Sequence, residues 1–296
     1  MKAGNRRVFV AGCGFAGLAL ARLLRERGWQ VLAGPYGQAS AEGLRAEGFE
    51  AFSCDLANLE SLDAVAGLSE CEAVVHSASS GRGGAEAYER VYFQGCKNLA
   101  AKAPGARLIF TSSTSVYAQT DGGWVSEESP AEPDRETGRW LRATEEFVVG
   151  VGGVSARLAG IYGPGRSVLL RKFLGGEAVL EGDGGRWINQ VHRDDIASGL
   201  AFLLERDVSG VFNLADNTPL TQRELYQGLS EKLGRPMPPY GPVDLGRKRG
   251  WTHKRVSNAK LRSMGWAPKY GSFFDALEQD PDLLAGASAA SSEDGE

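Results

Sequence analysis

Cysteine and histidine are scarce in this chain of 296 residues, and neither type is grouped in the sequence. The four cysteines lie in the first third of the chain, without the C-x-x-C spacing of a zinc or redox motif: Cys13, Cys54, Cys71 and Cys96. The three histidines are too scattered to predict a metal centre. We therefore expect free thiols in a reducing compartment and no metal site.

Long apolar runs and a strong charge of one sign are also absent. No stretch approaches the ~18 apolar residues that cross a bilayer, and residues 1–7 leave no room for a signal peptide before the first apolar run. The net charge of −4 gives no overall attraction to nucleic acid or to an anionic membrane. We expect a cytoplasmic globular protein that acts on a small molecule, with neither a nucleic acid nor a membrane as partner.

Glycine is abundant, and near the N-terminus it forms a pattern typical of phosphate binding. Residues 12–17 read Gly-Cys-Gly-Phe-Ala-Gly, after the apolar run of residues 8–11 and before a helical pattern over residues 18–27. In that setting the first glycine permits a tight turn, the second lets the backbone approach a pyrophosphate, and the third lets helix and strand pack closely. The amides of the helix start would face the phosphates. The residues expected to bind a dinucleotide here are Gly12, Gly14, Phe15, Ala16 and Gly17.

Cys13 lies inside this turn and has two interpretations. A helix N-terminus can lower the pKa of a thiol, which would suit a redox role. Alternatively, Cys13 is a small residue that fits a tight loop.

Apolar runs alternate with helical patterns through the first half of the chain. Five short strands are expected, at residues 8–11, 30–33, 49–52, 73–76 and 107–110. Their nearly continuous apolar character fits strands that are covered on both faces. The alternation of strands with helices predicts an α/β protein with a doubly wound parallel sheet.

Further motifs follow the glycine-rich turn in a definite order. They are Cys-Asp-Leu at 54–56, Val-His-Ser-Ala-Ser at 75–79, Phe-Thr-Ser-Ser-Thr-Ser-Val-Tyr at 110–117, Arg-Leu-Ala-Gly-Ile-Tyr-Gly-Pro-Gly at 157–165, the segment 187–196, and Gly-Trp-Ala-Pro at 265–268. In this order they resemble the extended short-chain dehydrogenase/reductase family, the NAD(P)-dependent nucleotide-sugar epimerases and dehydratases. The resemblance spans roughly residues 6–280.

The resemblance implies a Rossmann fold and assigns roles to single residues. The segment of Asp55 and Leu56 would lie at the adenine of the cofactor, which Asp55 would reach. The backbone of Ser77 and Ala78 would lie along the cofactor. Ser113 would be the catalytic residue that donates to the substrate oxygen and polarises it, although a serine at a strand end can also cap the local backbone.

The composition changes at the Gly-Pro-Gly turn of residues 163–165, where short glycine-interrupted segments replace the alternation. We expect an NAD(P)-binding domain over residues 1–163, to which residues 187–205 return. A smaller α+β substrate region would cover residues 164–284. Residues 285–296 lack large apolar side chains and are expected to be a disordered tail.

One departure from the family pattern concerns its reactive pair, a tyrosine and a lysine four residues later. The matching positions hold Thr137 and Leu141, and none of the eight tyrosines has a lysine at that spacing. An alkyl alcohol has too high a pKa to replace a phenol as an acid or base, and leucine carries no charge. We expect an atypical member of the family. It is either an oxidoreductase acting on a small hydroxyl or carbonyl compound, or a non-catalytic NAD(P)-binding sensor.

The choice of cofactor depends on the end of the second strand, where an acidic residue would bind the ribose 2′-hydroxyl of NAD. No acidic residue occurs there before Glu42. Tyr36, Gln38, Ser40 or Arg45 could accommodate a 2′-phosphate. The sequence allows NADP or NAD and favours NADP.

Several polar groups of the second half have more than one interpretation. Arg166 could bind a phosphate or carboxylate of the substrate, or be an exposed surface arginine. His192 with Asp194 could take part in catalysis or only orient the chain below the cofactor. The basic residues within 247–262 could hold a substrate diphosphate, bind nucleic acid or form a solvated face. A nucleotide sugar is only one possible substrate, because Ser257 stands where the family often has an aspartate.

Overall fold

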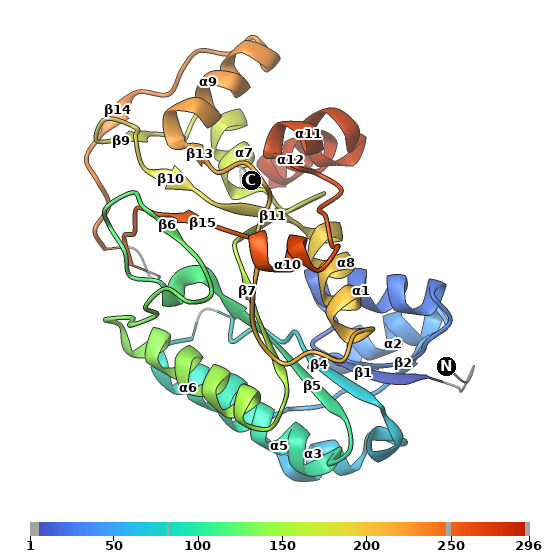
Figure 1. Ribbon diagram of the computed structural model, residues 1–296. Helices are drawn as coiled ribbons and strands as arrows, with labels where there is room; N and C mark the ends of the chain where they lie inside the picture. The colour runs from blue at the N-terminus through green and yellow to red at the C-terminus, as the bar shows by residue number, and fades with distance from the viewer. Residues whose placement is uncertain (1–5, 82, 247–249, 294–296) are drawn as a thin grey trace. The chain divides into compact units, whose positions relative to one another are not determined.

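A central sheet of parallel type organises the computed structural model, which describes residues 6–81, 83–246 and 250–293 (Figure 1). The sheet has seven strands in the order β12-β7-β5-β4-β1-β2-β3. In chain order these strands are β1 (Arg7–Ala11), β2 (Gln30–Gly34), β3 (Glu50–Ala51), β4 (Ala73–His76), β5 (Arg107–Ser113), β7 (Val154–Leu158) and β12 (Gly210–Leu214). The pairs β1–β2, β1–β4, β2–β3 and β4–β5 are parallel. The predicted doubly wound α/β fold is confirmed.

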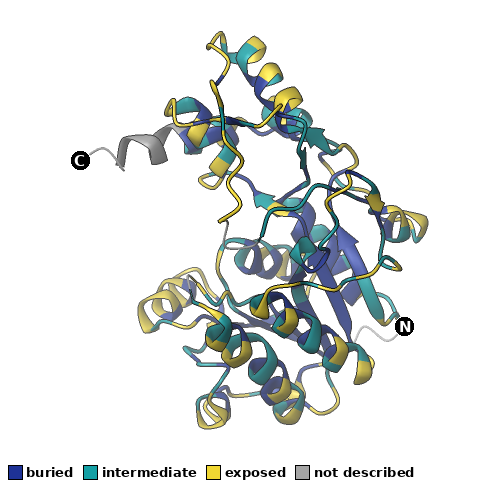
Figure 2. Ribbon diagram, turned by 90° about the vertical axis from the view of Figure 1, so that its left-hand side faces the viewer, coloured by how far each residue is buried: buried dark blue, intermediate teal, exposed yellow. Residues whose placement is uncertain are grey.

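Helices cover both faces of this sheet, as Figure 1 shows for α1 and α2 on one face and α5 and α6 on the other. The helical elements are α1 (Phe15–Glu26), α2 (Gln38–Ala46), α3 (Leu59–Asp63), η1 (Leu68–Glu70), α4 (Ala85–Tyr88), η2 (Glu89–Gln94), α5 (Gly95–Lys102), η3 (Thr114–Val116), α6 (Glu136–Gly150) and α8 (Arg193–Leu204). In α1 the apolar residues Leu20, Ala21 and Leu24 recur at helical spacing, and all three are buried against the sheet. Buried residues gather in the strands (Figure 2).

The helical segment after β4 is not a continuous α-helix. The element η2 is a π-helix between α4 and α5. A π-turn changes which carbonyls are used within the helix, and here the carbonyl of Val91 accepts a hydrogen bond from Nε2 of His76 at 2.8 Å. The helix is thereby bonded to the end of β4.

The chain divides into two compact units. The first holds the described residues of 1–116, 132–157 and 196–212, and the second those of 117–131, 158–195 and 213–296. Residues 158–195 thus lie in the second unit and residues 196–212 in the first. The boundary at residue 163 and the return of residues 187–205 to the cofactor domain stay predictions.

Strand pairing explains why the two segments before residue 163 belong to the second unit. The strand β6 (Trp124–Val125) pairs with β15 (Arg255–Val256), and β8 (Gly160–Tyr162) pairs with β11 (Gln190–His192). Each pair joins segments that are distant in the sequence, so local composition does not reveal it.

Helices surround the core of the second unit. Its other elements are α7 (Val168–Leu174), β9 (Leu180–Glu181), β10 (Trp187–Ile188), β13 (Leu220–Thr221), α9 (Gln222–Leu233), β14 (Tyr240–Gly241), α10 (Ala259–Ser263), α11 (Phe273–Gln279) and α12 (Pro281–Glu293). A capping box of Thr221 and Glu224 starts α9. The core contains Leu170, Phe173, Leu225, Leu229 and Phe273.

The helix α12 corrects the expectation of a disordered tail after residue 284. Leu283 and Ala287 lie four residues apart and are buried in the core of the second unit. Between them, a Cβ at Gly286 would lie 2.4 Å from the backbone nitrogen of Gly165. Gly286 and Ala287 therefore allow this part of the helix to pack closely without a large apolar side chain. Residues 294–296 lie outside the described residues.

A buried ion-pair network ties α6 to β5 and β7 in the first unit. Glu145 accepts hydrogen bonds from Ser112 at 2.6 Å and from Nε and Nη2 of Arg157 at 2.9 and 2.7 Å. Both Glu145 and Arg157 are buried, and Arg142 also pairs with Glu145. The network satisfies charges that burial would otherwise make costly.

We predict that Glu145→Leu destabilises the protein by about 3–5 kcal/mol, because it leaves the buried Arg157 without this carboxylate. Glu146→Leu is the matched control, since Glu146 is 69% exposed and pairs with Arg142 at 3.2 Å. It should cost less than about 1 kcal/mol. Urea unfolding followed by circular dichroism measures both. Equal loss in the two variants would contradict the prediction.

Candidate functional site

The glycine-rich residues form the turn between β1 and α1, at the carboxyl end of the strand. Gly12 has a φ of +87°, and a Cβ there would lie 2.3 Å from the Cα of Ala78. A Cβ at Gly17 would lie 2.1 Å from the carbonyl oxygen of Gly12. Both positions therefore require glycine, the first for its conformation and for close packing, the second for packing alone.

Gly14 differs from the other two glycines because no atom lies within 4 Å of a Cβ built on it. Its φ of −87° is also open to other residues. Gly14 is the N-cap of α1, whose first turn has neither a capping side chain nor an acidic residue. An uncapped helix start behind open space is suited to an anion such as a pyrophosphate.

The ends of three neighbouring strands meet at this turn. The amide of Gly12 donates to the carbonyl of Gly34 at the end of β2, at 2.7 Å. The amide of Ser77, after β4, donates to the carbonyl of Ala11 at 2.7 Å. The structure thus brings Gly12, Gly17, Ser77 and Ala78 together at the carboxyl edge of the sheet, where ligands of such sheets bind.

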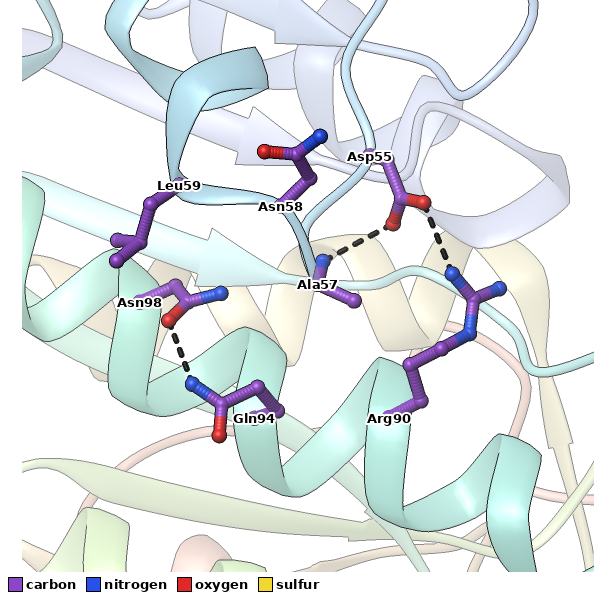
Figure 3. A pocket seen from close by; sticks show the side chains of 7 residues that line it. All are labelled: Asp55, Ala57, Asn58, Leu59, Arg90, Gln94 and Asn98. Carbon is purple, nitrogen blue, oxygen red and sulfur yellow. Dashed lines mark hydrogen bonds and ion pairs between the residues drawn. The ribbon is translucent and has the colours of Figure 1, made fainter.

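Asp55 and Leu56 follow β3, and Asp55 lines a pocket of about 440 Å³ in the first unit (Figure 3). Oδ1 of Asp55 accepts from the amide of Ala57 at 3.0 Å, and Oδ2 accepts from Nη1 of Arg90 at 2.9 Å. The carbonyl of Leu56, a buried residue, accepts from Nδ2 of Asn98 at 2.8 Å. The lining residues are Asp55, Ala57, Asn58, Leu59, Arg90, Gln94 and Asn98.

Ser113 is the last residue of β5 and is half-buried. Its Oγ accepts a hydrogen bond from the amide of Ser115 at 3.2 Å, which is the local cap that the sequence allowed. Because the oxygen is the acceptor in this bond, the hydroxyl can still donate. On α6, Thr137 is half-buried and Leu141 is buried, so neither position supplies a titratable group.

Arg166 and His192 belong to the second unit. Arg166 is exposed, and its backbone exchanges two hydrogen bonds with Gly163 at 2.9 and 3.0 Å, which closes the Gly-Pro-Gly turn. His192 is buried and its Nδ1 accepts from the amide of Asp194 at 3.2 Å. Nε2 therefore carries the proton and donates to Asp280 at 3.1 Å. Burial lowers the pKa of His192, and both ring nitrogens are used within the fold.

Cys13 does not have the lowered pKa that its place in the turn allowed. Burial raises the pKa of its thiol to about 12, and Sγ donates to the carbonyl of Val10 at 3.3 Å. All four cysteines are free thiols. Cys13 therefore fits the interpretation as a small residue in a tight turn, and its raised pKa does not favour a redox role.

Lys254 is the group that the sequence did not single out, because it lies within a basic stretch that is typical of a solvated face. In the structure it is buried, and Nζ donates to the carbonyl of Tyr117 at 2.8 Å and to Oγ1 of Thr252 at 2.9 Å. Burial, with the nearby charge of Arg186, lowers the pKa of Lys254 to about 7. Residues 247–249 of the same stretch lie outside the described residues.

Among the described residues, no three or more His, Cys, Asp or Glu side chains are placed to hold a metal ion. Over the same residues no helix has the length and apolar character needed to cross a membrane.

A seven-stranded Rossmann-type sheet with a glycine turn at its carboxyl edge defines a dinucleotide-binding class of fold. The model of the NAD dependent epimerase/dehydratase family matches residues 8–215. The chain belongs to this family, and the resemblance in its motifs is confirmed.

Two named proteins are similar to this chain over more than half of its length. Protein YeeZ of Escherichia coli (strain K12) is 29% identical over 266 residues, which cover 86% of this chain and 93% of the relative. The 2′-dehydrokanamycin reductase of Streptomyces kanamyceticus is 31% identical over 173 residues, which cover 52% of this chain and 48% of that enzyme.

Solved structures share the fold at lower identity. The UDP-glucose 4-epimerase of Thermotoga maritima, solved with UDP-glucose, has a TM-score of 0.80 at 20% identity and covers 96% of this chain and 99% of its own. The UDP-glucose 4-epimerase of Thermus thermophilus, solved with NAD, has a TM-score of 0.79 at 21% identity, with the same coverage. The family indicates a nicotinamide cofactor, and these structures show that the fold is shared.

Alanine substitutions at Gly14 and Gly17 should affect different properties, dinucleotide affinity in the first case and thermal stability in the second. Gly14→Ala should fold with nearly unchanged thermal stability, because its methyl group meets no atom of the protein. The same methyl group would occupy the approach of a pyrophosphate, and should weaken dinucleotide binding by about tenfold or more, ~1.4 kcal/mol. Gly17→Ala should lower the stability instead, because its methyl group meets a backbone oxygen. Thermal unfolding and nucleotide titration test both variants. Unaltered binding by Gly14→Ala would contradict the role of the turn.

The lowered pKa of Lys254 predicts how the free energy of unfolding depends on pH. Its pKa is about 7 in the folded protein and 10.5 for an ordinary lysine. Between these values the unfolded chain binds more protons, so this residue makes the folded state less stable as the pH falls. Lys254→Met removes that effect, and its stability relative to the parent protein should rise between about pH 9 and pH 7.

Urea unfolding at the two pH values measures the effect of Lys254→Met. Lys232→Met serves as the control, because Lys232 is partly exposed and pairs with Glu278. The control should show no such rise. A difference between Lys254→Met and the parent that is the same at both pH values would rule out the lowered pKa.

Proposed function

We propose that this protein is an NAD(P)-dependent oxidoreductase of the epimerase/dehydratase type that acts on a small hydroxyl or carbonyl compound. The observation that carries the proposal is the open, uncapped start of α1 at Gly14, held in place by glycine contacts that no other residue permits. Family membership supports a nicotinamide cofactor. The name of one relative, a 2′-dehydrokanamycin reductase, fits the reaction class.

The cofactor would lie along the carboxyl edge of the sheet. We assign its pyrophosphate to the turn of Gly12, Gly14, Phe15, Ala16 and Gly17, its adenine to Asp55 and Leu56, and its middle to the backbone of Ser77 and Ala78. The bound nicotinamide would supply or accept the hydride. The protein contributes orientation and electrostatic stabilisation around it.

The end of β2 supports NADP as the cofactor. The helix α2 begins directly after it, with Gly37 as N-cap, no capping side chain and no acidic residue in the first turn. Glu42, the first acid after β2 in the sequence, accepts from Nε2 of Gln38 at 3.2 Å. A 2′-phosphate at an uncapped helix start is favourable, whereas a 2′-hydroxyl lacks its usual carboxylate. Arg45 is less suited than the sequence suggested, because its Nε donates to the carbonyl of Ala51.

Ser113 is assigned to the substrate oxygen, to which its hydroxyl can donate. Arg166 is assigned to an anionic group of the substrate, since it is exposed and its backbone closes the Gly-Pro-Gly turn. The free thiols support a cytoplasmic location for the reaction.

A second candidate function is a non-catalytic NAD(P)-binding sensor. Thr137 and Leu141 favour it, because they replace the acid/base pair on which the family chemistry depends. In that case the fold would bind the cofactor without turnover, and a partner would distinguish its oxidised and reduced forms.

We predict that NADPH binds, more tightly than NADH, and is oxidised by at least one compound of a panel of ketones and keto sugars. Fluorescence of the reduced ring measures both nucleotide binding and turnover. Ser113→Ala should lower turnover by about 10²–10³-fold with unchanged nucleotide binding, as for loss of a hydrogen bond to a developing oxyanion. Ser115→Ala, the same change two residues away, should retain turnover.

Each result distinguishes the two candidate functions. Nucleotide binding with no oxidation across the panel would favour the sensor over the enzyme. If neither reduced nucleotide bound, both functions would be rejected.

A further inference from the structure

Arg90 lies in the π-helix η2 and reaches the pocket beside Asp55 (Figure 3). Arg90, Gln94 and Asn98 are four residues apart and line the same pocket from one helical face. Their neighbours hold the face in place, because Nε2 of Gln94 donates to Oδ1 of Asn98 at 2.7 Å and Nδ2 of Asn98 donates to the carbonyl of Leu56.

The pocket has the composition of a site for a flat polar ring. Its volume of about 440 Å³ falls within the ~300–1,000 Å³ of small-ligand pockets. Leu59 presents an apolar side chain that is 44% exposed, and the carboxylate of Asp55 supplies acceptors. In Figure 3 Leu59 and Arg90 lie at opposite sides of the pocket.

The ion pair of Arg90 with Asp55 leaves both groups able to contact a ligand. Each oxygen of Asp55 accepts one hydrogen bond, from Ala57 or from Arg90, and a carboxylate oxygen can accept a second. The side chain of Arg90 is 50% exposed. The hydrogen bond from Nη1 to Asp55 lies in the plane of the guanidinium, so this bond does not itself cover either face of the plane. An arginine that is held in this way loses little further freedom when a ring stacks on it.

We propose that Arg90 is a purine-binding residue, whose guanidinium lies against the base at the adenosine end of the bound dinucleotide. Asp55 holds the guanidinium and accepts from the amino group of the base. This inference rests on the proposed function, and adds to it a residue on the helix after β4 that neither the glycine turn nor the strand ends indicate.

Planarity distinguishes this role from a general attraction between the positive charge and the phosphates. Lysine at position 90 would keep the charge, but it has no flat face to stack on a ring. Stacking of a base on an aromatic side chain or on arginine makes a contribution that is independent of phosphate contacts. Reduced nicotinamide mononucleotide, the other half of the cofactor, has no purine. Its binding affinity should therefore not depend on Arg90.

Calorimetric titration of the full chain with NADH and with reduced nicotinamide mononucleotide tests the proposal. Arg90→Leu and Arg90→Lys should both weaken NADH binding by about tenfold, and should leave mononucleotide binding unchanged. Arg22→Leu is the matched control, since Arg22 forms an equally exposed ion pair with Glu47 at 2.8 Å, away from the pocket. It should bind NADH as the parent protein does.

The outcomes separate this proposal from the function on which it rests. Parent-like NADH binding by Arg90→Lys would overturn the stacking role, and so would an equal loss of mononucleotide binding in Arg90→Leu. Failure of the parent protein to bind either NADH or NADPH would overturn the proposed function itself. Thermal unfolding of each variant shows that a loss of binding is not a loss of fold, and Arg90→Lys keeps the ion pair if Arg90→Leu proves unstable.

Discussion

The close approach of the β1–α1 turn to the residues after β4 is the contact on which the candidate site depends. A Cβ at Gly12 would overlap the backbone of Ala78, and one at Gly17 would overlap the carbonyl of Gly12. Backbone therefore lies directly on backbone, and the start of α1 is fixed relative to three strand ends. A rigid, uncapped helix start of this kind provides oriented amides without any charged side chain.

The sheet keeps its helices in place independently of the family's usual reactive pair. On α6 the positions of that pair hold Thr137 and Leu141, yet the helix is still bound to β5 and β7 through Glu145 and Arg157. The residues that position α6 are thus separate from those that would do chemistry on it. A change of chemistry, or its loss, is compatible with the same fold.

Charge has different consequences at different places in this chain. Arg90 and Asp55 form a partly exposed pair at a pocket, where each can still contact a ligand. Lys254, in contrast, is buried, and burial together with the charge of Arg186 lowers its pKa. Its ammonium donates a hydrogen bond to the carbonyl of Tyr117 within the second unit. His192 is likewise occupied within the fold, by Asp280 and Asp194. Residue type alone does not separate a site group from a structural one.

Local patterns in the sequence determined the order of strands and helices, the glycine turn and the family, because each of these depends on neighbouring residues and fixed short spacings. Only the tertiary structure decided the division into units, since that division depends on pairs such as β6 with β15. It also decided that Lys254 is buried, that α12 is ordered and that Arg90 meets Asp55. These features depend on contacts between residues far apart in the chain, and no periodicity in the sequence reports such contacts.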